Sequence, residues 1–128
     1  MAALIYLDTH VVTWLRAGRT DLLPELARRL LEENELLISP FVVLELQYLF
    51  EIQRASEPAE VVLAALTRDV GLEVCELPFF EVARMALGQS WTRDPFDRII
   101  VSQAALRNAP LLTRDQVIRD HYSQPVWD

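Results

Sequence analysis

The chain has 128 residues, of which 52% are hydrophobic and 24% are charged. This composition is typical of a globular protein and unlike that of a disordered one, and we expect a single domain spanning residues 1–128. The net charge of −7 argues against nucleic-acid binding through a broad basic surface. It does not exclude a nuclease, because acids gathered in a metal site add negative charge that the bound cation reverses locally.

The single cysteine, Cys75, excludes an internal disulfide and a cysteine-based zinc site. The apolar N-terminal run stops at Asp8 and has no basic segment before it, so we expect no signal peptide. No run is long enough to cross a membrane. These features predict a cytoplasmic protein with no membrane partner.

Short apolar runs and turn signals predict strands that alternate with helices along the chain. The expected strands cover residues 4–7, 36–38, 72–77 and 110–113, and residues 125–127 could add an edge strand. The expected helices cover residues 9–17, 23–34, 39–54, about 56–70, 78–91, a segment opening at residue 94, and about 114–122. Such alternation predicts an α/β fold with three α/β/α layers and a central, mainly parallel sheet of four to five strands.

Glu45 is the acidic residue with no ordinary structural explanation. It lies within the helix predicted at 39–54, which has Ser39 as N-cap and Pro40 at the first helical position. A buried, unpaired carboxylate costs several kcal/mol, so it must be neutral, paired or bound to a metal. No lysine is available, because all 12 basic residues are arginines. At helical spacing Glu45 shares its face with Phe41, Val42, Tyr48, Leu49 and Ile52, and lies opposite Gln47, Glu51 and Arg54.

Four other acids have ordinary alternatives as helix-capping groups. Asp8 ends the first predicted strand and could cap the helix that follows. Asp94 precedes Pro95 as an N-cap would, and Asp97 three residues later could complete a capping box. Asp115 is expected in the first turn of its helix, where an acid is common.

Taken together, these acids predict a divalent metal site. In parallel sheets, ligands bind at the carboxyl ends of the strands, where Asp8 and Asp115 are expected. If Glu45 and Asp97 converge with them, the carboxylates repel one another unless a cation binds. All-oxygen ligands favour Mg²⁺ or Mn²⁺, which can activate water for attack on a phosphodiester.

Four segments in order resemble the PIN domain, and within it the VapC-type toxins of bacterial type II toxin–antitoxin systems. They are Tyr6-Leu7-Asp8-Thr9-His10, Ser39-Pro40 leading to Glu45, Arg93-Asp94-Pro95-Phe96-Asp97-Arg98, and Leu112-Thr113-Arg114-Asp115. The resemblance covers nearly the whole chain. It implies a three-layer PIN-like fold and a Mg²⁺- or Mn²⁺-dependent endoribonuclease.

By position, the resemblance assigns catalysis and metal binding to Asp8, Glu45, Asp97 and Asp115. Asp94 is implied as a further ligand or only a cap, and Thr113 as a hydroxyl that organises the last acid. The resemblance also implies an RNA substrate, a cognate antitoxin that places a basic side chain in the acidic site, and a homodimer. Tyr48 and Phe50 could serve a self-interface, but burial in the core explains them equally well.

The remaining polar and aromatic residues carry weaker signals. Arg93, Arg98 and Arg114 flank the acids and could bind substrate phosphates, or could form salt bridges to neighbouring carboxylates. His10 could approach a phosphate, although helix packing or a surface position is the simpler interpretation. His121 is interpreted as a surface residue, and Trp14 and Trp91 as helical core residues rather than platforms for RNA bases.

Two other functions remain as alternatives. An inactive PIN-like binding module would retain the fold without metal-dependent activity, but the intact acids argue against it. A phosphatase-like enzyme with Asp8 as nucleophile is disfavoured, because the residue two positions later is His10 rather than a second aspartate. Such enzymes also use a lysine for charge compensation, and this chain has none.

Overall fold

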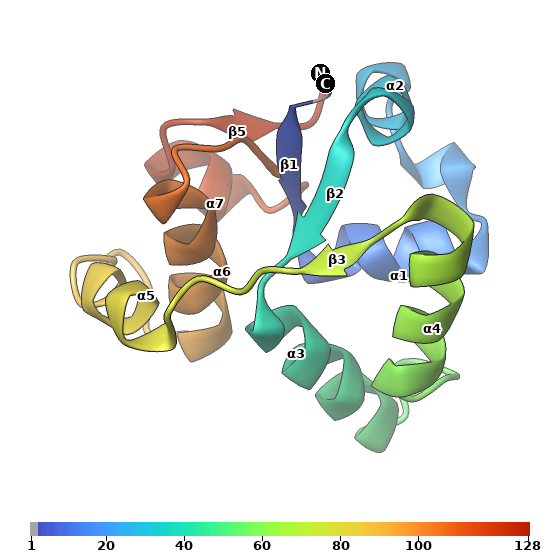
Figure 1. The fold of residues 1–128 in the computed structure, drawn as a ribbon, viewed down its shortest axis with the longest axis horizontal. Helices are drawn as coiled ribbons and strands as arrows, with labels where there is room; N and C mark the ends of the chain where they lie inside the picture. The colour runs from blue at the N-terminus through green and yellow to red at the C-terminus, as the bar shows by residue number, and fades with distance from the viewer. Residues whose placement is uncertain (1–2) are drawn as a thin grey trace.

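The computed structural model describes residues 3–128, and its five strands form one sheet (Figure 1). The strand order is β3-β2-β1-β4-β5, and each pairing among the described residues is parallel. The predicted parallel sheet is therefore confirmed, including its fifth strand. The strands are β1 (Leu4–Leu7), β2 (Glu35–Ile38), β3 (Glu73–Val74), β4 (Leu111–Leu112) and β5 (Pro125–Val126).

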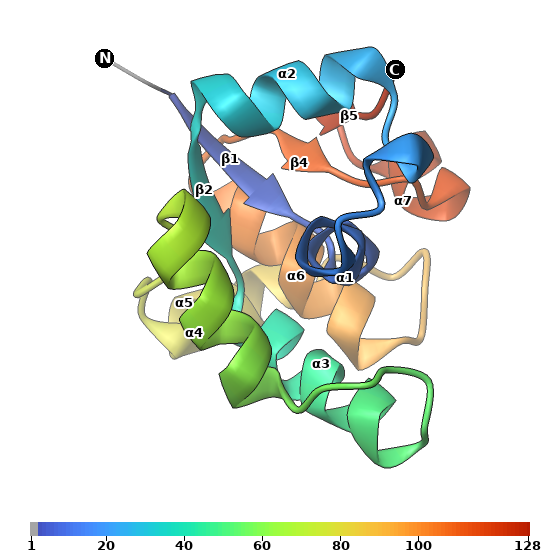
Figure 2. The ribbon, with the colours of Figure 1, turned by 90° about the vertical axis from the view of Figure 1, so that its right-hand side faces the viewer.

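Helices cover both faces of this sheet, which gives the three predicted layers. Helices α1, α2 and α4 lie on one side and α5, α6 and α7 on the other, with α3 below the strand ends (Figures 1 and 2). No helix in the described part of the chain is long and apolar enough to cross a membrane. The helices are α1 (Thr9–Ala17), the 3₁₀ turn η1 (Thr20–Leu22), α2 (Glu25–Glu33), α3 (Pro40–Glu51), α4 (Ala59–Val70), α5 (Phe79–Ala86), α6 (Pro95–Leu106) and α7 (Gln116–His121).

The main core forms around β1, the central strand. Ile5, Tyr6 and Leu7 are almost completely buried, because helices cover both faces of a parallel sheet. Continuous apolar runs in β1, β2 and β4 thus supply the core directly. A smaller cluster around Val82 and Ile99 joins α5 to α6.

Several predicted helix ends are confirmed by their capping bonds. The Ser39 side chain accepts a hydrogen bond from the backbone N–H of Phe41, and Pro40 occupies the first turn of α3. Helix α1 ends at Gly18, which adopts φ = 70°, a left-handed conformation that favours glycine. The N-cap serine, the proline and the C-terminal glycine act on neighbouring backbone groups, so the sequence could predict these helix ends without the tertiary fold.

Several predicted elements are longer than the observed ones, and three of them show why. The helix expected at 23–34 is α2, Glu25–Glu33, because Pro24 holds Leu23 in an extended conformation. The helix expected at 78–91 is α5, which ends at Ala86 just before Gly88, so Trp91 lies in a turn and not in a helix. The strand expected at 72–77 pairs only at Glu73–Val74, as is common for a sheet edge.

Helix α3 does not bury the face that its sequence pattern indicates. Its fully buried residues are Val42 and Leu46, whereas Tyr48 and Ile52 are 49% and 42% exposed. Glu45 is half-buried. The prediction that Glu45 lies in the middle of a buried apolar face was therefore wrong, because α3 lies beyond the strand ends and packs mainly against α4 and α6.

Candidate active site

The strand order brings the first and last predicted acids to the same edge of the sheet. Strands β1 and β4 are neighbours, with Leu7 opposite Leu112, and the Asp8 N–H donates to the Leu112 carbonyl over 3.0 Å. Asp8 follows β1 directly, and Asp115 follows β4 by three residues. Both therefore lie at carboxyl strand ends, where parallel sheets commonly bind ligands.

Thr113 links these two acids through its buried hydroxyl. The Thr113 Oγ1–H donates to Asp8 Oδ2 over 2.6 Å, and the same oxygen accepts the Asp115 N–H over 3.0 Å. One side chain thus orients the Asp8 carboxylate and the backbone that carries Asp115. This geometry gives a physical basis to the organising role implied for Thr113.

Asp8 is almost fully buried, with 6% of its surface exposed. Burial raises the pKa of its carboxyl, and the nearby Asp115 adds to the rise, while the hydrogen bonds from Thr113 and from the Thr9 N–H act in the opposite direction. These two donors offset part of the cost of burying the Asp8 carboxylate, and they fix its orientation.

Glu45 joins the site through a contact that the sequence analysis missed. The hydroxyl of Thr9, a fully buried residue at the start of α1, donates to Glu45 Oε1 on α3. Burial raises the pKa of Glu45, the Thr9 bond lowers it, and the charges of Asp8 and Asp94 raise it. The only sequence signal for this role was a hydroxyl residue directly after Asp8.

Asp97 carries a strongly raised pKa. Burial, followed in decreasing order by the charges of Asp94, Asp8, Asp115 and Glu45, raises its pKa to about 7. The expected capping box is not formed, since the Asp94 N–H is bound by Thr92 Oγ1 instead. Within residues 3–128, no hydrogen bond stabilises the Asp97 carboxylate.

Asp94 and Asp115 are both helix caps. Asp94 Oδ1 accepts the Phe96 N–H over 2.8 Å at the start of α6. Asp115 is the N-cap of α7 rather than a residue of its first turn as predicted, and its Oδ1 accepts the N–H groups of Val117 and Ile118. One oxygen of each carboxylate is thus engaged, and both charges still act on Asp97.

The donor chemistry of this cluster fits a hydrated divalent cation. The five acids offer only oxygen ligands, which Mg²⁺ and Mn²⁺ prefer. Within residues 3–128, no three acidic, histidine or cysteine side chains form a preassembled ligand set. Mg²⁺ keeps several of its waters and needs only one or two direct carboxylates. A group of acids whose charges act on one another is therefore compatible with it, even without a complete ligand set.

The three flanking arginines have different environments. Arg93 and Arg98 donate to backbone carbonyls, and Arg98 reaches Ala86 and Leu87 at the end of α5 over 3.1 and 3.2 Å. Arg114 is exposed, and its guanidinium lies 5.8 Å from the centre of the Trp14 ring. None of the three forms an ion pair within the described residues, so the salt-bridge alternative has no support there.

Both histidines of the chain make aromatic contacts. His10 is exposed, and its ring lies 6.0 Å from that of the half-buried Trp14 in a tilted arrangement. His121 at the end of α7 stacks on Trp91 at 5.1 Å and 9°. The sequence suggested no partner for His121, because these residues lie in segments that only the fold brings together.

Comparison with known proteins agrees with this arrangement. Residues 5–123 match the model of the PIN domain. The chain is 29% identical to Ribonuclease VapC22 of Mycobacterium tuberculosis, over 95% of each protein. The crystal structure of VapBC2 from Rickettsia felis bound to a promoter DNA fragment aligns with a TM-score of 0.70 at 20% identity, covering 98% of this chain and 99% of that one.

A toxin–antitoxin complex from Klebsiella pneumoniae aligns with a TM-score of 0.64 at 20% identity, covering 98% of this chain and 96% of that chain. At such identities, the two solved structures establish the fold alone. The family match covers most of the chain and includes each of the five acids. The chain therefore belongs to the PIN domain family.

Proposed function

We propose that this protein is a metal-dependent endoribonuclease and the toxin component of a type II toxin–antitoxin system. The observation that carries the proposal is Asp97, a half-buried carboxylate whose pKa is raised to about 7 by burial and by four neighbouring acids. Repulsion among carboxylates lowers the stability of the metal-free fold, so it has no structural benefit. In a cation site the same carboxylates attract and bind the metal. Similarity to Ribonuclease VapC22 supports RNA as the substrate.

In this proposal Asp8, Asp97 and Asp115 would hold Mg²⁺ or Mn²⁺, and Asp94 would be available as a further ligand through its second oxygen. When bound, the cation would lower the pKa of a coordinated water and stabilise charge at the phosphorus. Glu45 orients the attacking water, with its own carboxylate held by the Thr9 hydroxyl. Thr113 holds Asp8 in the orientation needed for a ligand.

RNA cleavage in Mg²⁺ or Mn²⁺, compared with EDTA, tests this function. Asp8→Asn and Asp97→Asn should each remove most of the activity while the protein remains folded by circular dichroism. Glu33→Gln is a matched control. Glu33 is exposed at the end of α2, next to the amino end of β2, and the acidic cluster lies at the opposite, carboxyl ends of the strands. Undiminished cleavage by a folded Asp8→Asn or Asp97→Asn protein would reject the assignment.

We also propose a cognate antitoxin as the protein partner. Solved structures with the same fold include the toxin–antitoxin complex from Klebsiella pneumoniae. A site with five acids is electrostatically complementary to a basic side chain, which would occupy the place of the cation and block it. Co-purification with the product of an adjacent gene, and loss of RNA cleavage on its addition, would test this partner.

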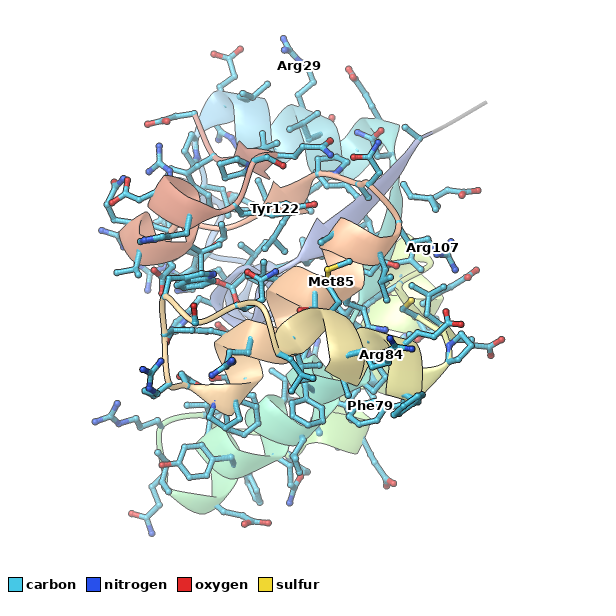
Figure 3. The ribbon with its side chains drawn as sticks, turned by 90° about the vertical axis from the view of Figure 1, so that its left-hand side faces the viewer. Arg29, Phe79, Arg84, Met85, Arg107 and Tyr122 are labelled. Atoms are coloured by element: carbon cyan, nitrogen blue, oxygen red, sulfur yellow. The ribbon has the colours of Figure 1, made fainter. Side chains whose placement is uncertain are left out.

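A homodimer through α5 and the neighbouring end of α3 is the third proposal. On α5, Phe79 (Figure 3) and Phe80 are 50 and 71% exposed. Leu87, directly after the helix, is 77% exposed, and Tyr48 on α3 is 49% exposed. Contiguous exposed apolar groups commonly mark association surfaces. Sedimentation velocity should detect a dimer that Phe80→Ser disrupts, and a wild-type monomer at all concentrations would contradict it.

A further inference from the structure

We propose that Trp14, Arg114 and His10 form a subsite for one unpaired nucleotide of a single-stranded RNA, beside the acidic cluster. This inference rests on the proposed ribonuclease function and names the part of the substrate that the neighbouring surface would bind. In the sequence, Trp14 has the pattern of a helical core residue. Its position in the fold gives it a second role.

A cavity of about 420 Å³ connects these residues to the acids. It is lined by Asp8, His10, Trp14, Arg114, Asp115 and Gln116. Two of the six lining residues belong to the acidic cluster, so a group bound in the cavity lies directly against the site of proposed cleavage. The other four offer an aromatic face, a cation and hydrogen-bonding groups, which are the features that bind nucleotides.

Arg114 supplies the positive charge of the cavity. It is exposed, and it takes part in none of the four ion pairs formed within the described residues. Its guanidinium instead lies 5.8 Å from the centre of the Trp14 ring. An arginine that is free of carboxylate partners, in a protein with a net charge of −7, is available to a phosphate.

Trp14 supplies a rigid stacking surface. Its ring is half-buried and contacts Trp127 on one side, with ring centres 5.9 Å apart, and His10 on another at 6.0 Å. These contacts fix the indole before any ligand binds. The Arg114 guanidinium lies over the indole ring, so an unpaired base entering the cavity would stack against this arginine–tryptophan pair.

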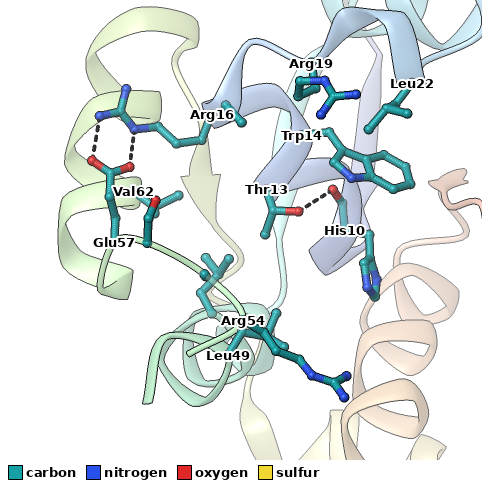
Figure 4. A pocket seen from close by; sticks show the side chains of 14 residues that line it. His10, Thr13, Trp14, Arg16, Arg19, Leu22, Leu49, Arg54, Glu57 and Val62 are labelled. Carbon is teal, nitrogen blue, oxygen red and sulfur yellow. Dashed lines mark hydrogen bonds and ion pairs between the residues drawn. The ribbon is translucent and has the colours of Figure 1, made fainter. Parts of the chain in front are cut away.

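A second cavity extends this surface along α1. It has a volume of about 460 Å³ and shares His10 and Trp14 with the first (Figure 4). Of its three arginines, Arg16 pairs with Glu57 and Arg19 with Asp21, whereas Arg54 forms no ion pair within residues 3–128. Arg114 and Arg54, neither of which forms an ion pair within residues 3–128, thus line two cavities that share Trp14, and either guanidinium could bind a phosphate of the RNA backbone.

Binding of a fluorescently labelled single-stranded RNA, measured by anisotropy in the Asp97→Asn background to prevent turnover, tests the subsite. Arg114→Gln should weaken binding about 10-fold and reduce the slope of log affinity against log salt by about one. Trp14→Leu should weaken binding about 10-fold with no change in that slope, and Trp14→Phe should bind nearly as the parent does. Arg29→Gln, which removes an exposed charge on α2, should change neither quantity.

Trp14 also packs on the core, so its variants are checked by circular dichroism, and the exposed Arg114 gives a test that does not depend on folding. If wild type cleaves RNA but folded Arg114→Gln and Trp14→Leu bind as the parent does, the subsite is rejected and the ribonuclease proposal stands. If these variants lose only binding to a protein partner, the cavity is a protein-binding surface and the subsite is also rejected. If wild type neither binds nor cleaves RNA, the ribonuclease proposal itself fails.

Discussion

Replacing Asp97 with asparagine should make the metal-free protein more stable at neutral pH. Asparagine has nearly the shape of aspartate but carries no charge, so it relieves repulsion from Asp94, Asp8, Asp115 and Glu45. It also removes the cost of keeping a charged group half-buried. A residue that stabilises the fold when it is removed is one retained for binding or catalysis.

The magnitude follows from the pKa of Asp97, which is about 7 in the folded protein against an ordinary value of 3.8. Between these values the folded state retains a proton that the unfolded chain has released, so stability falls as pH rises from about 4 to about 7. The full shift corresponds to about 4 kcal/mol at neutral pH, and partial solvent screening reduces the expected gain for Asp97→Asn to about 2 kcal/mol.

Urea unfolding in EDTA, followed by circular dichroism near pH ~4 and near pH ~8, measures this effect. Wild type and Asp97→Asn should have nearly equal stability at the lower pH, and the variant should be more stable at the higher pH. Glu33→Gln, which changes an exposed acid at the opposite sheet edge, should give no pH-dependent difference.

Excess Mn²⁺ should reduce or reverse the difference in stability between wild type and Asp97→Asn. A bound cation neutralises the repulsion in wild type, so added Mn²⁺ should stabilise wild type more than the variant near pH ~8. An Asp97→Asn protein that is less stable than wild type in EDTA at that pH would show that the acids do not share one electrostatic field, and the reasoning would be refuted.

Three further predictions concern the surroundings of the site. Thr113→Val should lower the free energy of unfolding by about 1–3 kcal/mol in urea melts, because it leaves the buried Asp8 without its hydroxyl donor; an unchanged stability would contradict the bond. Ser102→Ala should leave the melting temperature unchanged or raise it, since the buried Ser102 hydroxyl has no partner within residues 3–128, and a clear loss would imply a missed partner. His121→Ala should cost about 0.5–1.5 kcal/mol through loss of the Trp91 stack; a Trp91→Ala, His121→Ala cycle without coupling energy would contradict that contact.

Local sequence signals predicted most elements of the fold. Ser39-Pro40 and Asp94-Pro95 each begin a helix where expected, because a cap and a proline act on backbone groups only two or three residues away. Apolar runs predicted β1, β2 and β4 because buried parallel strands need no alternation. The ends of α2, α5 and β3 were less predictable, since these depend on where packing stops.

The candidate site divides in the same way. Asp8, Asp97 and Asp115 could be named from their places at strand ends and helix starts. The sequence could not indicate which oxygens they engage, because Thr113 contacts Asp8 across 105 positions and Thr9 contacts Glu45 across 36. Side chains so far apart in the chain meet only once the order of β2, β1 and β4 is set.

The sequence by itself determined the alternating elements, the acidic residues and the family resemblance, because propensity, capping and residue type are local properties. The tertiary structure alone decided that Glu45 is half-buried beside Thr9 and that Tyr48 is exposed, because α3 lies beyond the strand ends and only part of its apolar surface meets α4 and α6. It also raised the pKa of Asp97 to about 7, since burial and mutual repulsion exist only when separate segments converge.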